Sequence, residues 1–363
     1  MECLETLVWN NYTREELAGL SVRAPDEEIR KSVQKRWDLV AKPLGGMGKF
    51  ETLIAQIGAV TGTEKIDISG KAVVIMCADN GIVEEGVSQS GQEVTLSVAR
   101  SMGQKQSSVG QMAQIAGADT IPVDIGINHR EEIAGVINRK VRCGTRNFKK
   151  KPAMTEKEAI QAIAAGMDLV CSLKQSGINL IATGEMGIGN TTTSSAVVAS
   201  LLKCKADKVT GRGAGLDDEG LSRKRQVIAD AIEKYDLYHA DALTVLKTVG
   251  GLDIAGLAGV CMGGAVYRIP IVLDGVISMT AALLAERILP GTKSCLLPSH
   301  KGKEPAMAAL LQELDMEPVI DGDLALGEGT GAVMMFPLLD MALRIYDAGN
   351  TFSDIGIERY TRF

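Results

Sequence analysis

The sequence predicts an α/β fold that is built on a mostly parallel β-sheet. Short apolar runs rich in β-branched residues alternate along the chain with longer stretches of helical periodicity. Strands that follow one another through helices make right-handed crossovers, which place the strands parallel in one sheet. Glycine or short polar residues follow most of the apolar runs. In such sheets ligands bind beyond the carboxyl ends of the strands.

The composition is that of an ordinary soluble globular protein. The chain has 363 residues, of which 45% are hydrophobic and 23% charged, and this length can hold one large α/β domain or two domains. Aromatic residues make up only 4%, so the core must be aliphatic and rich in methionine, with Met334 and Met335 predicted inside it. The net charge of −6 and the scarcity of aromatic residues argue against nucleic acid as the main partner.

Neither the cysteines nor the histidines form a known ligand pattern. The seven cysteines are scattered and never spaced C-x-x-C, which predicts buried free thiols in a reducing compartment. The three histidines do not form an H-E-x-x-H motif, so we predict no metal site and no cofactor.

No targeting or membrane signal is visible in the chain. Residues 1–5 lack the basic and apolar regions of a signal peptide. The longest charge-free apolar run, residues 254–266, is too short and too rich in glycine to span a bilayer. We therefore expect a cytoplasmic protein without a membrane partner.

The predicted elements begin with a helical segment over residues 1–40. Asp26 can cap a helix in which Val33 and Trp37 share one apolar face, and the glycine-rich residues 42–51 end that pattern. Strands are predicted at 72–77, 120–125, 179–182, 269–273 and 294–297. Helices are predicted at 92–102, 107–115, 155–174, 194–202, 219–235, on both sides of 249–253, and at 278–289, 304–314 and 332–346. Polar tails after the strands should converge on an active-site rim: residues 79–81, 124, 184–185, 274–275 and 299–300.

Residues 179–193 combine a strand, a glycine-rich turn and a helix start. Any of residues 190–193 can cap a helix over 194–202, and the turn can bring backbone N–H groups to an anion such as phosphate. The candidate ligands are Gly187, Gly189, Asn190 and Thr191. The G-x-x-G-x-G spacing is neither a dinucleotide fingerprint nor a P-loop, so a mere tight connection stays an alternative. Glu185 in such a turn should face developing positive charge.

With these landmarks, the chain resembles the nicotinate-nucleotide–dimethylbenzimidazole phosphoribosyltransferases of cobalamin biosynthesis over nearly its whole length. The motifs that carry the resemblance occur in the family's order: KPLGGMG (42–48), CADNG (77–81), EGVS (85–88), GEMG (184–187), VGGLD (249–253), LDG (273–275), PSH (298–300) and LGEGTG (326–331).

The resemblance implies a homodimer with a doubly wound, Rossmann-like parallel sheet and a small helical domain formed from both termini. Residues 1–40 together with 332–363 would form the small domain, and residues 41–331 the α/β catalytic domain. The reaction would transfer the phosphoribosyl group of nicotinate mononucleotide to dimethylbenzimidazole or a related aromatic base. Its products would be α-ribazole 5′-phosphate and nicotinate.

The resemblance also implies roles for particular residues. Glu328 falls on the family's general base, and Glu185 and Gly187 fall on the donor-phosphate turn. Ser90 falls on a position of the base pocket, and Lys224 on a lysine near the active site.

Four further residues of these motifs are candidate substrate ligands: Asp253, Asp274, His300 and Gly327. The chain departs from the family's common pattern at Asn80, where the family often has His, and at Ser88 and Gly91. These departures bear on the acceptor base.

The implied chemistry suits carboxylates. Nicotinate mononucleotide already carries a cationic pyridinium, so nicotinate can leave as a neutral ring nitrogen without a general acid. A carboxylate can stabilise the oxocarbenium-like centre and can accept the acceptor's proton. Because no pyrophosphate leaves and the sequence shows no paired-acid loop for magnesium, we predict metal-independent activity.

Two other functions stay open at this stage. The same scaffold could act on adenine or a phenol, or the chain could be a non-catalytic nucleotide-binding or carrier protein. Taken alone, Glu328 would be a solvated loop residue, and Lys224 would lie on a solvated helix face between Arg223 and Arg225. His300 would be either a ligand neighbour or a residue of the rim.

Overall fold

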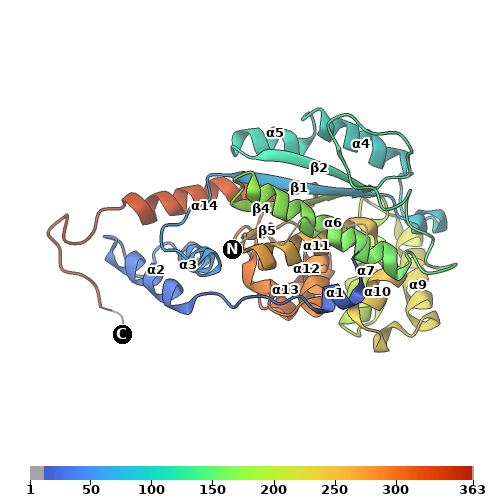
Figure 1. The fold of residues 1–363 in the computed structure, drawn as a ribbon. Helices are drawn as coiled ribbons and strands as arrows, with labels where there is room; N and C mark the ends of the chain where they lie inside the picture. The colour runs from blue at the N-terminus through green and yellow to red at the C-terminus, as the bar shows by residue number, and fades with distance from the viewer. Residues whose placement is uncertain (1–11, 362–363) are drawn as a thin grey trace.

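The chain folds around a parallel sheet of six strands. The computed structural model describes residues 12–361, and in this part the strand order is β3-β2-β1-β4-β5-β6 (Figure 1). All neighbouring strands run parallel. This order is that of a doubly wound sheet, so the predicted fold class is confirmed. The strands are β1 (Lys71–Ala78), β2 (Asp119–Gly126), β3 (Ile137–Asn138), β4 (Leu180–Met186), β5 (Ile271–Leu273) and β6 (Leu296–Pro298).

The predicted helices are all present, with ends displaced by a few residues. Helices α3 and α8 were not predicted, and a short 3₁₀ helix, Thr292–Cys295, replaces the predicted start of the last strand. The helices are α1 (Arg14–Ala18), α2 (Glu27–Leu39), α3 (Lys49–Thr61), α4 (Glu93–Gly103), α5 (Ser108–Ile115), α6 (Glu156–Gln175), α7 (Asn190–Leu201), α8 (Ala206–Val209), α9 (Asp218–Lys234), α10 (Ala242–Val249), α11 (Leu252–Tyr267), α12 (Val276–Ile288), α13 (Ala306–Leu314) and α14 (Thr330–Ala348).

Both faces of the sheet are covered, and β1 shows how the sequence achieves this. Successive side chains of a strand point to opposite faces of the sheet. Because helices cover both faces, all eight residues of β1 are buried. Val74 and Met76 belong to the core that contains residues of α6 and α11, whereas Val73 and Ile75 belong to the core that contains residues of α3 and α14. Apart from Lys71 at its start, which pairs with Asp340 at 2.9 Å, the strand is therefore apolar, as buried parallel strands are.

Helices α6 and α11 pack closely because glycine lines their contact. A Cβ on Gly166 would lie 2.1 Å from the Gly256 carbonyl oxygen, and a Cβ on Gly259 would lie 1.9 Å from that of Ile163. The apolar run 254–266 is thus the buried helix α11. In the described part of the chain, no helix has the length and apolar character needed to cross a membrane.

Segments from both ends of the chain meet on the α14 side of the sheet. The Trp37 and Tyr346 rings lie 5.3 Å apart, and Arg36 donates to the Tyr346 carbonyl. Figure 1 shows α2, α3 and α14 next to one another, to the left of the labelled strands. Their core continues into sheet residues such as Val73. The boundaries of a separate small domain stay a prediction. Residues 1–11 and 362–363 lie outside the described residues. They include Cys3 and residues 1–5, which were searched for a signal peptide.

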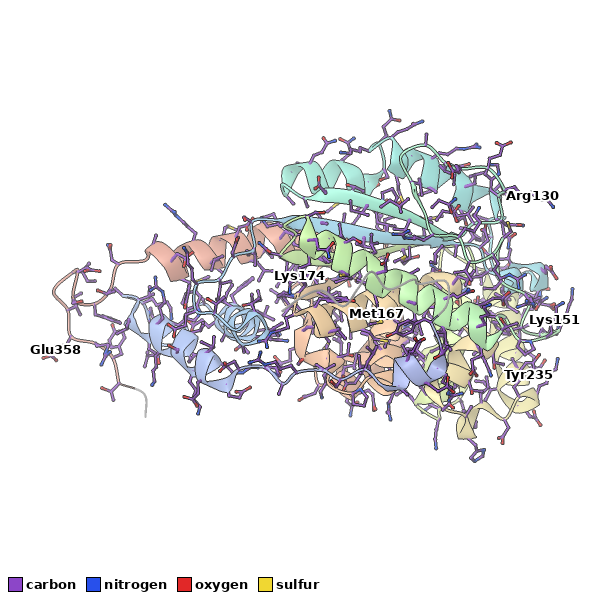
Figure 2. The ribbon with its side chains drawn as sticks, viewed as in Figure 1. Arg130, Lys151, Met167, Lys174, Tyr235 and Glu358 are labelled. Carbon is purple, nitrogen blue, oxygen red and sulfur yellow. The ribbon has the colours of Figure 1, made fainter. Side chains whose placement is uncertain are left out.

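The methionine-rich core is present, with one correction. Met167 of α6 is buried, whereas Arg130 and Lys151 lie at the periphery (Figure 2). Met335 is also buried, but Met334 is 41% exposed, because the two neighbours point to different sides of α14. Among the described cysteines, Cys143 is exposed rather than buried.

Candidate active site

A pocket lies beyond the carboxyl ends of β4, β5 and β6, next to the point where the strand order reverses between β1 and β4. Its volume is about 240 Å³. It is lined by the end of β4 with the start of α7, by the residues that follow β5 and β6, and by two loops: residues 185–188, 190–191, 213–214, 274–278, 300, 302–304 and 324–327.

The start of α7 differs from the prediction. The helix begins at Asn190 rather than Ser194, and its N-cap is Gly189, with a φ of 91° and no side-chain capping bond. Glycine is favoured there because of this left-handed conformation. The side chains of Asn190 and Thr191, predicted as possible caps, bond to Glu185 and Lys224 instead. The helix thereby places its N-terminus and two polar side chains at the pocket.

Glycine is required at position 187 for packing as well as for access. A Cβ there would lie 2.4 Å from the Ala78 carbonyl oxygen and 2.6 Å from Asp253 Oδ2. The backbone amides of Asn190 and Thr192 already donate to the carbonyls of Gly187 and Gly189, at 3.0 and 2.9 Å. These two amides are therefore not free to bind an anion. An anion at this turn would be held by the helix dipole and by the side chains of the turn.

Glu185 is half-buried in the pocket wall. Asn190 Nδ2 donates to one carboxyl oxygen, and the other lies 2.9 Å from where a Cβ on Gly327 would be. Desolvation, assisted by the charges of Asp253 and Asp274, raises the pKa of Glu185 to about 8. This side chain is therefore mostly protonated at neutral pH and can donate a hydrogen bond.

Asp253 supports this arrangement from the start of α11. It is fully buried, its Oδ1 accepts from the Ile254 amide at 2.9 Å, and burial raises its pKa to about 6. The nearby amides of Asn190 and Asn80 favour its charged form. Asp253 thus acts on Glu185 through charge and lies behind the pocket wall.

Lys224 of α9 is a buried cation next to the pocket. It is 0% exposed, and its Nζ donates to Thr191 Oγ1 at 2.8 Å. Burial lowers its pKa to about 8, while the Glu304 carboxylate favours the charged form. Because Lys224 is buried, it does not lie on a solvated helix face, which was the alternative suggested by its basic neighbours. A mostly charged ammonium and a helix N-terminus therefore lie at the same end of the pocket.

Glu328 lies in a turn that packs on β4. Gly327, Glu328 and Gly329 have φ angles of 83°, 61° and 92°, and the left-handed region is uncommon for a residue other than glycine. A Cβ on Gly184 would lie 2.4 Å from the Glu328 carbonyl oxygen. Glu328 Oε2 accepts from the Val109 amide of α5 at 3.4 Å, and burial raises the pKa of its carboxyl.

The tails of β5 and β6 meet beside this turn. Asp274 accepts from the amides of Gly329 and Ala332 at 3.2 and 3.1 Å. His300 Nδ1 lies 4.0 Å from Asp274 Oδ1 and 2.9 Å from Ser299 Oγ. Burial lowers the pKa of His300.

The pocket therefore contains most of the predicted residues and some that were not predicted. Its lining includes Glu185, Asp274, His300 and Gly327, but neither Glu328, whose side chain reaches α5, nor Ser90. Ser90 lies in the loop before α4, where its amide donates to Ser88 Oγ at 3.3 Å.

Several lining residues that sequence reasoning missed come from loops. Gly213 lies in the loop between α8 and α9, and Lys303 and Glu304 follow the His300 tail. A charged pair three and four residues after a strand-end histidine was the available signal, but Glu304 was interpreted only as a helix start.

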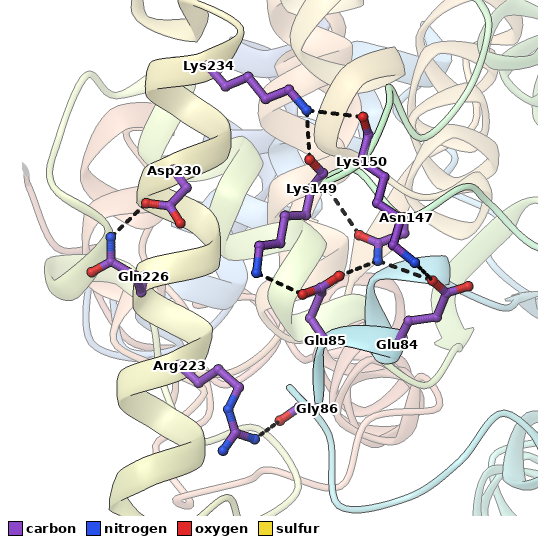
Figure 3. A network of polar contacts seen from close by, with 10 residues as sticks. All are labelled: Glu84, Glu85, Gly86, Asn147, Lys149, Lys150, Arg223, Gln226, Asp230 and Lys234. Carbon is purple, nitrogen blue, oxygen red and sulfur yellow. Dashed lines mark hydrogen bonds and ion pairs between the residues drawn. The ribbon is translucent and has the colours of Figure 1, made fainter.

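A polar network outside the pocket holds the loop after β1. Asn147 is buried, and its Nδ2 donates to Glu85 Oε1 at 2.6 Å and to Glu84 Oε2 at 3.3 Å (Figure 3). Lys149 and Lys150 pair with the same two carboxylates at 2.9 and 2.7 Å. The 3₁₀ helix that follows β1 is thereby joined to the loop before α6.

The same network reaches α9. Arg223 donates to the Gly86 carbonyl at 3.1 Å, and Lys234 donates to the carbonyl of Lys149 at 2.7 Å (Figure 3). The loop that carries Ser90 is therefore fastened to the helix that carries Lys224. Within residues 12–361, no group of three or more histidine, cysteine or acidic side chains is arranged to hold a metal ion.

Comparison with known proteins agrees with this geometry. A family model described as phosphoribosyltransferase matches residues 22–357. The nicotinate-nucleotide–dimethylbenzimidazole phosphoribosyltransferases of Clostridium acetobutylicum and Acetivibrio thermocellus are each 45% identical to this chain, over 92% of it and 95% of the relative. The crystal structure of CobT from Thermus thermophilus superposes with a TM-score of 0.87 at 37% identity, over 92% of this chain and 100% of that one. The chain therefore belongs to the nicotinate-nucleotide–dimethylbenzimidazole phosphoribosyltransferase family.

Proposed function

We propose that this enzyme transfers the phosphoribosyl group of nicotinate mononucleotide to dimethylbenzimidazole or a related aromatic base. The products are α-ribazole 5′-phosphate and nicotinate, for the cobalamin nucleotide loop. The observation that carries the proposal is the polarity of the pocket. Its lining includes the N-terminus of α7, which lies beside the buried ammonium of Lys224, and the carboxyl group of Glu185. The donor has matching charges, an anionic phosphate and a cationic pyridinium.

The phosphate binds at the start of α7 in this proposal. Lys224 supplies the cation, and Thr191 and Asn190 supply polar side chains at the positive end of the helix dipole. Gly187 and Gly189 keep the turn close and free of side chains. The pyridinium and ribose then extend toward Glu185.

Glu185 lies where charge develops at the ribosyl carbon. As the bond to nicotinate breaks, positive charge grows there, and the surrounding carboxyl groups stabilise it. The cationic donor lowers the pKa of Glu185, so binding of the donor favours the carboxylate form of this side chain before the bond to nicotinate breaks.

Glu328 is the general base in this proposal. The acceptor base must lose its N–H proton as the new bond to ribose forms, and a carboxylate with a raised pKa is suited to take it. The flanking Gly327 and Gly329 carry no side chains, so a flat heteroaromatic ring can approach. Ser90 and the departures at Asn80 and Ser88 belong to the acceptor side.

Assembly and location complete the proposal. The enzyme is placed in the cytoplasm. It forms a homodimer in this proposal, since most soluble homo-oligomers are closed twofold dimers. Exposed apolar side chains on α14 support self-association, with Met334, Met341 and Ile345 at 41, 56 and 37% exposure.

The test is a turnover assay with nicotinate mononucleotide and a panel of acceptors. Release of nicotinate is followed with dimethylbenzimidazole, adenine and phenol in separate reactions. We expect the fastest release with dimethylbenzimidazole. Faster release with adenine or phenol would assign the enzyme to another base, and no release with any acceptor would favour a nucleotide-binding protein without activity.

A further inference from the structure

We propose that Asp274 is a positioning residue for Glu328, and that it holds the turn of the general base instead of binding substrate. The inference rests on the proposed function, because it takes Glu328 as the proton acceptor. It changes the role that the sequence suggested for Asp274.

Both oxygens of Asp274 are used by the backbone around Glu328. Oδ2 accepts from the Gly329 amide at 3.2 Å, and Oδ1 accepts from the Ala332 amide at 3.1 Å. The side chain is only 4% exposed, although it lines the pocket. A buried carboxylate that accepts hydrogen bonds from these two amides fixes the first turn of α14, and so fixes the direction in which the chain runs from Glu328 into the helix.

The turn needs such support. Three successive residues, 327–329, have left-handed φ angles, and the middle one is a glutamate. Such a conformation costs free energy that the surrounding contacts must supply. Asp274 also places a negative charge at the N-terminus of α14, a helix of 19 residues, where the dipole favours it.

His300 closes the other side of the same segment. A Cβ on Gly331 would lie 2.1 Å from His300 Nδ1, so the ring packs directly on the first turn of α14. Gly331 is thereby held against His300, while its neighbours Gly329 and Ala332 bond to Asp274. The first turn of α14 can thus move little while these contacts persist.

Loss of one acceptor should release the turn and displace the Glu328 carboxylate. Small displacements of a catalytic group have large effects, since about 1 Å can lower the rate 10²-fold. We expect Asp274→Asn, which keeps the shape but turns an NH₂ group toward one amide, to lower kcat by about 10–100-fold. The KM for nicotinate mononucleotide should change little.

The decisive comparison is a double-mutant cycle with Glu328→Gln. If Asp274 acts through Glu328, the double variant should be no slower than Glu328→Gln alone. Multiplying losses, or a large rise in the donor KM for Asp274→Asn, would make Asp274 a direct substrate ligand and overturn the proposal.

The matched control is Asp26→Asn. Asp26 likewise accepts two backbone amides at a helix start, those of Glu28 and Ile29 at 3.1 Å, but it caps α2. Asp26→Asn should leave kcat unchanged. A comparable loss of kcat in this control would show that any weakened cap lowers activity, and would remove the case for Asp274.

Amide hydrogen exchange supplies a measurement that does not depend on turnover. In the unsubstituted chain, the amides of Gly329 and Ala332 should exchange slowly, and Asp274→Asn should accelerate both. Rapid exchange of these amides before any substitution would overturn the inference, even if Asp274→Asn failed to fold. Absence of turnover in the unsubstituted chain, with these amides protected, would instead count against the proposed function alone.

Discussion

At the scale of single residues, the site assigns different tasks to chemically similar carboxyl groups. Glu185 is held protonated by desolvation and by its acidic neighbours, and Asp253 keeps a lower pKa through its hydrogen bonds. Glu328 has one bond to the Val109 amide, whereas Asp274 is bonded through both oxygens. Environments that separate the pKa values of neighbouring acids in this way identify acid and base roles.

The role of Glu328 is tested by Glu328→Gln. The amide preserves shape and hydrogen bonding but cannot accept a proton, so kcat should fall by about 10²–10⁴-fold, the usual contribution of general-base catalysis. The donor KM should change little. Steady-state kinetics over a range of pH is the measurement, and a variant that turns over at the original rate would reduce Glu328 to a positioning group.

The raised pKa of Glu185 predicts a pH dependence of stability. Between its ordinary pKa of about 4.3 and the folded value of about 8, the folded state keeps a proton that the unfolded state has lost. The contribution of this group therefore lowers the free energy of unfolding as pH rises through that window, by at most about 1.4 kcal/mol per pH unit, and is constant above it.

Glu185→Gln should remove this dependence. Urea unfolding of both chains at pH 5 to 9 is the measurement, and the stability of the variant relative to the unsubstituted chain should increase with pH. Glu358→Gln, a change at an exposed residue near the C-terminus, is the control and should show no such trend. Parallel curves for Glu185→Gln and the unsubstituted chain would mean that Glu185 is ionised in the fold.

At the scale of elements, the site depends on where helices start and on what fastens the loops. Helix α7 begins at a left-handed glycine, and α14 begins after the Glu328 turn, so both helix N-termini lie at the rim of the pocket. The network around Asn147 fastens the loop after β1 to α9 (Figure 3). Positions of catalytic groups are thus fixed by contacts outside the pocket.

Asn147→Ala tests the energetic weight of that network. Removal of its amide leaves the Glu85 carboxylate, whose side chain is only 16% exposed, with one donor fewer, so stability should fall by about 1–3 kcal/mol. Gln226→Ala is the control and should cost no more than about 0.5 kcal/mol, because within residues 12–361 Gln226 bonds only to Asp230, on the exposed side of α9. Denaturant unfolding measures both, and equal effects would mean that the Asn147 network contributes nothing beyond a surface contact.

Sequence reasoning located the elements well where periodicity is strong. Strand β1 and helix α6, with its Thr155 capping box, form close to their predicted bounds. The two-residue strand β3 has no pattern to detect, and the start of α7 was misplaced because the conformation of Gly189 is set by packing on Asn80 and Val83.

Site residues were predictable to the extent that motifs mark strand ends. Asp274 and His300 were found by this route, but their contacts with α14 depend on residues far along the chain. The burial of Lys224 and the reach of Glu328 toward Val109 likewise arise from packing between distant segments. Periodicity carries no such information.

At the scale of the whole molecule, one continuous sheet with both faces covered gives a rigid frame whose carboxyl edge carries the site. The order of its strands could be expected only from the family resemblance, because periodicity does not specify which strands are neighbours. Helix α14 buries one side against this frame, and its exposed apolar side chains point away from it.

Self-association is the expected property at this scale. Light scattering at micromolar concentration should give twice the chain mass of 38.5 kDa. Replacement of Met341 by lysine, on the exposed side of α14, should shift the equilibrium toward the monomer if that face is buried between copies. A clean monomer for the unsubstituted chain would contradict the homodimer.

The most direct test of the central claim is product formation by the EDTA-treated enzyme from nicotinate mononucleotide and dimethylbenzimidazole. Mass spectrometry would follow α-ribazole 5′-phosphate and nicotinate in the same reaction. We expect the two products in equal amounts, without added metal, and a rate at least about 100-fold lower for Glu328→Gln. Nicotinate without α-ribazole 5′-phosphate, or activity that returns only with magnesium, would contradict a direct transfer carried by the side chains of this site.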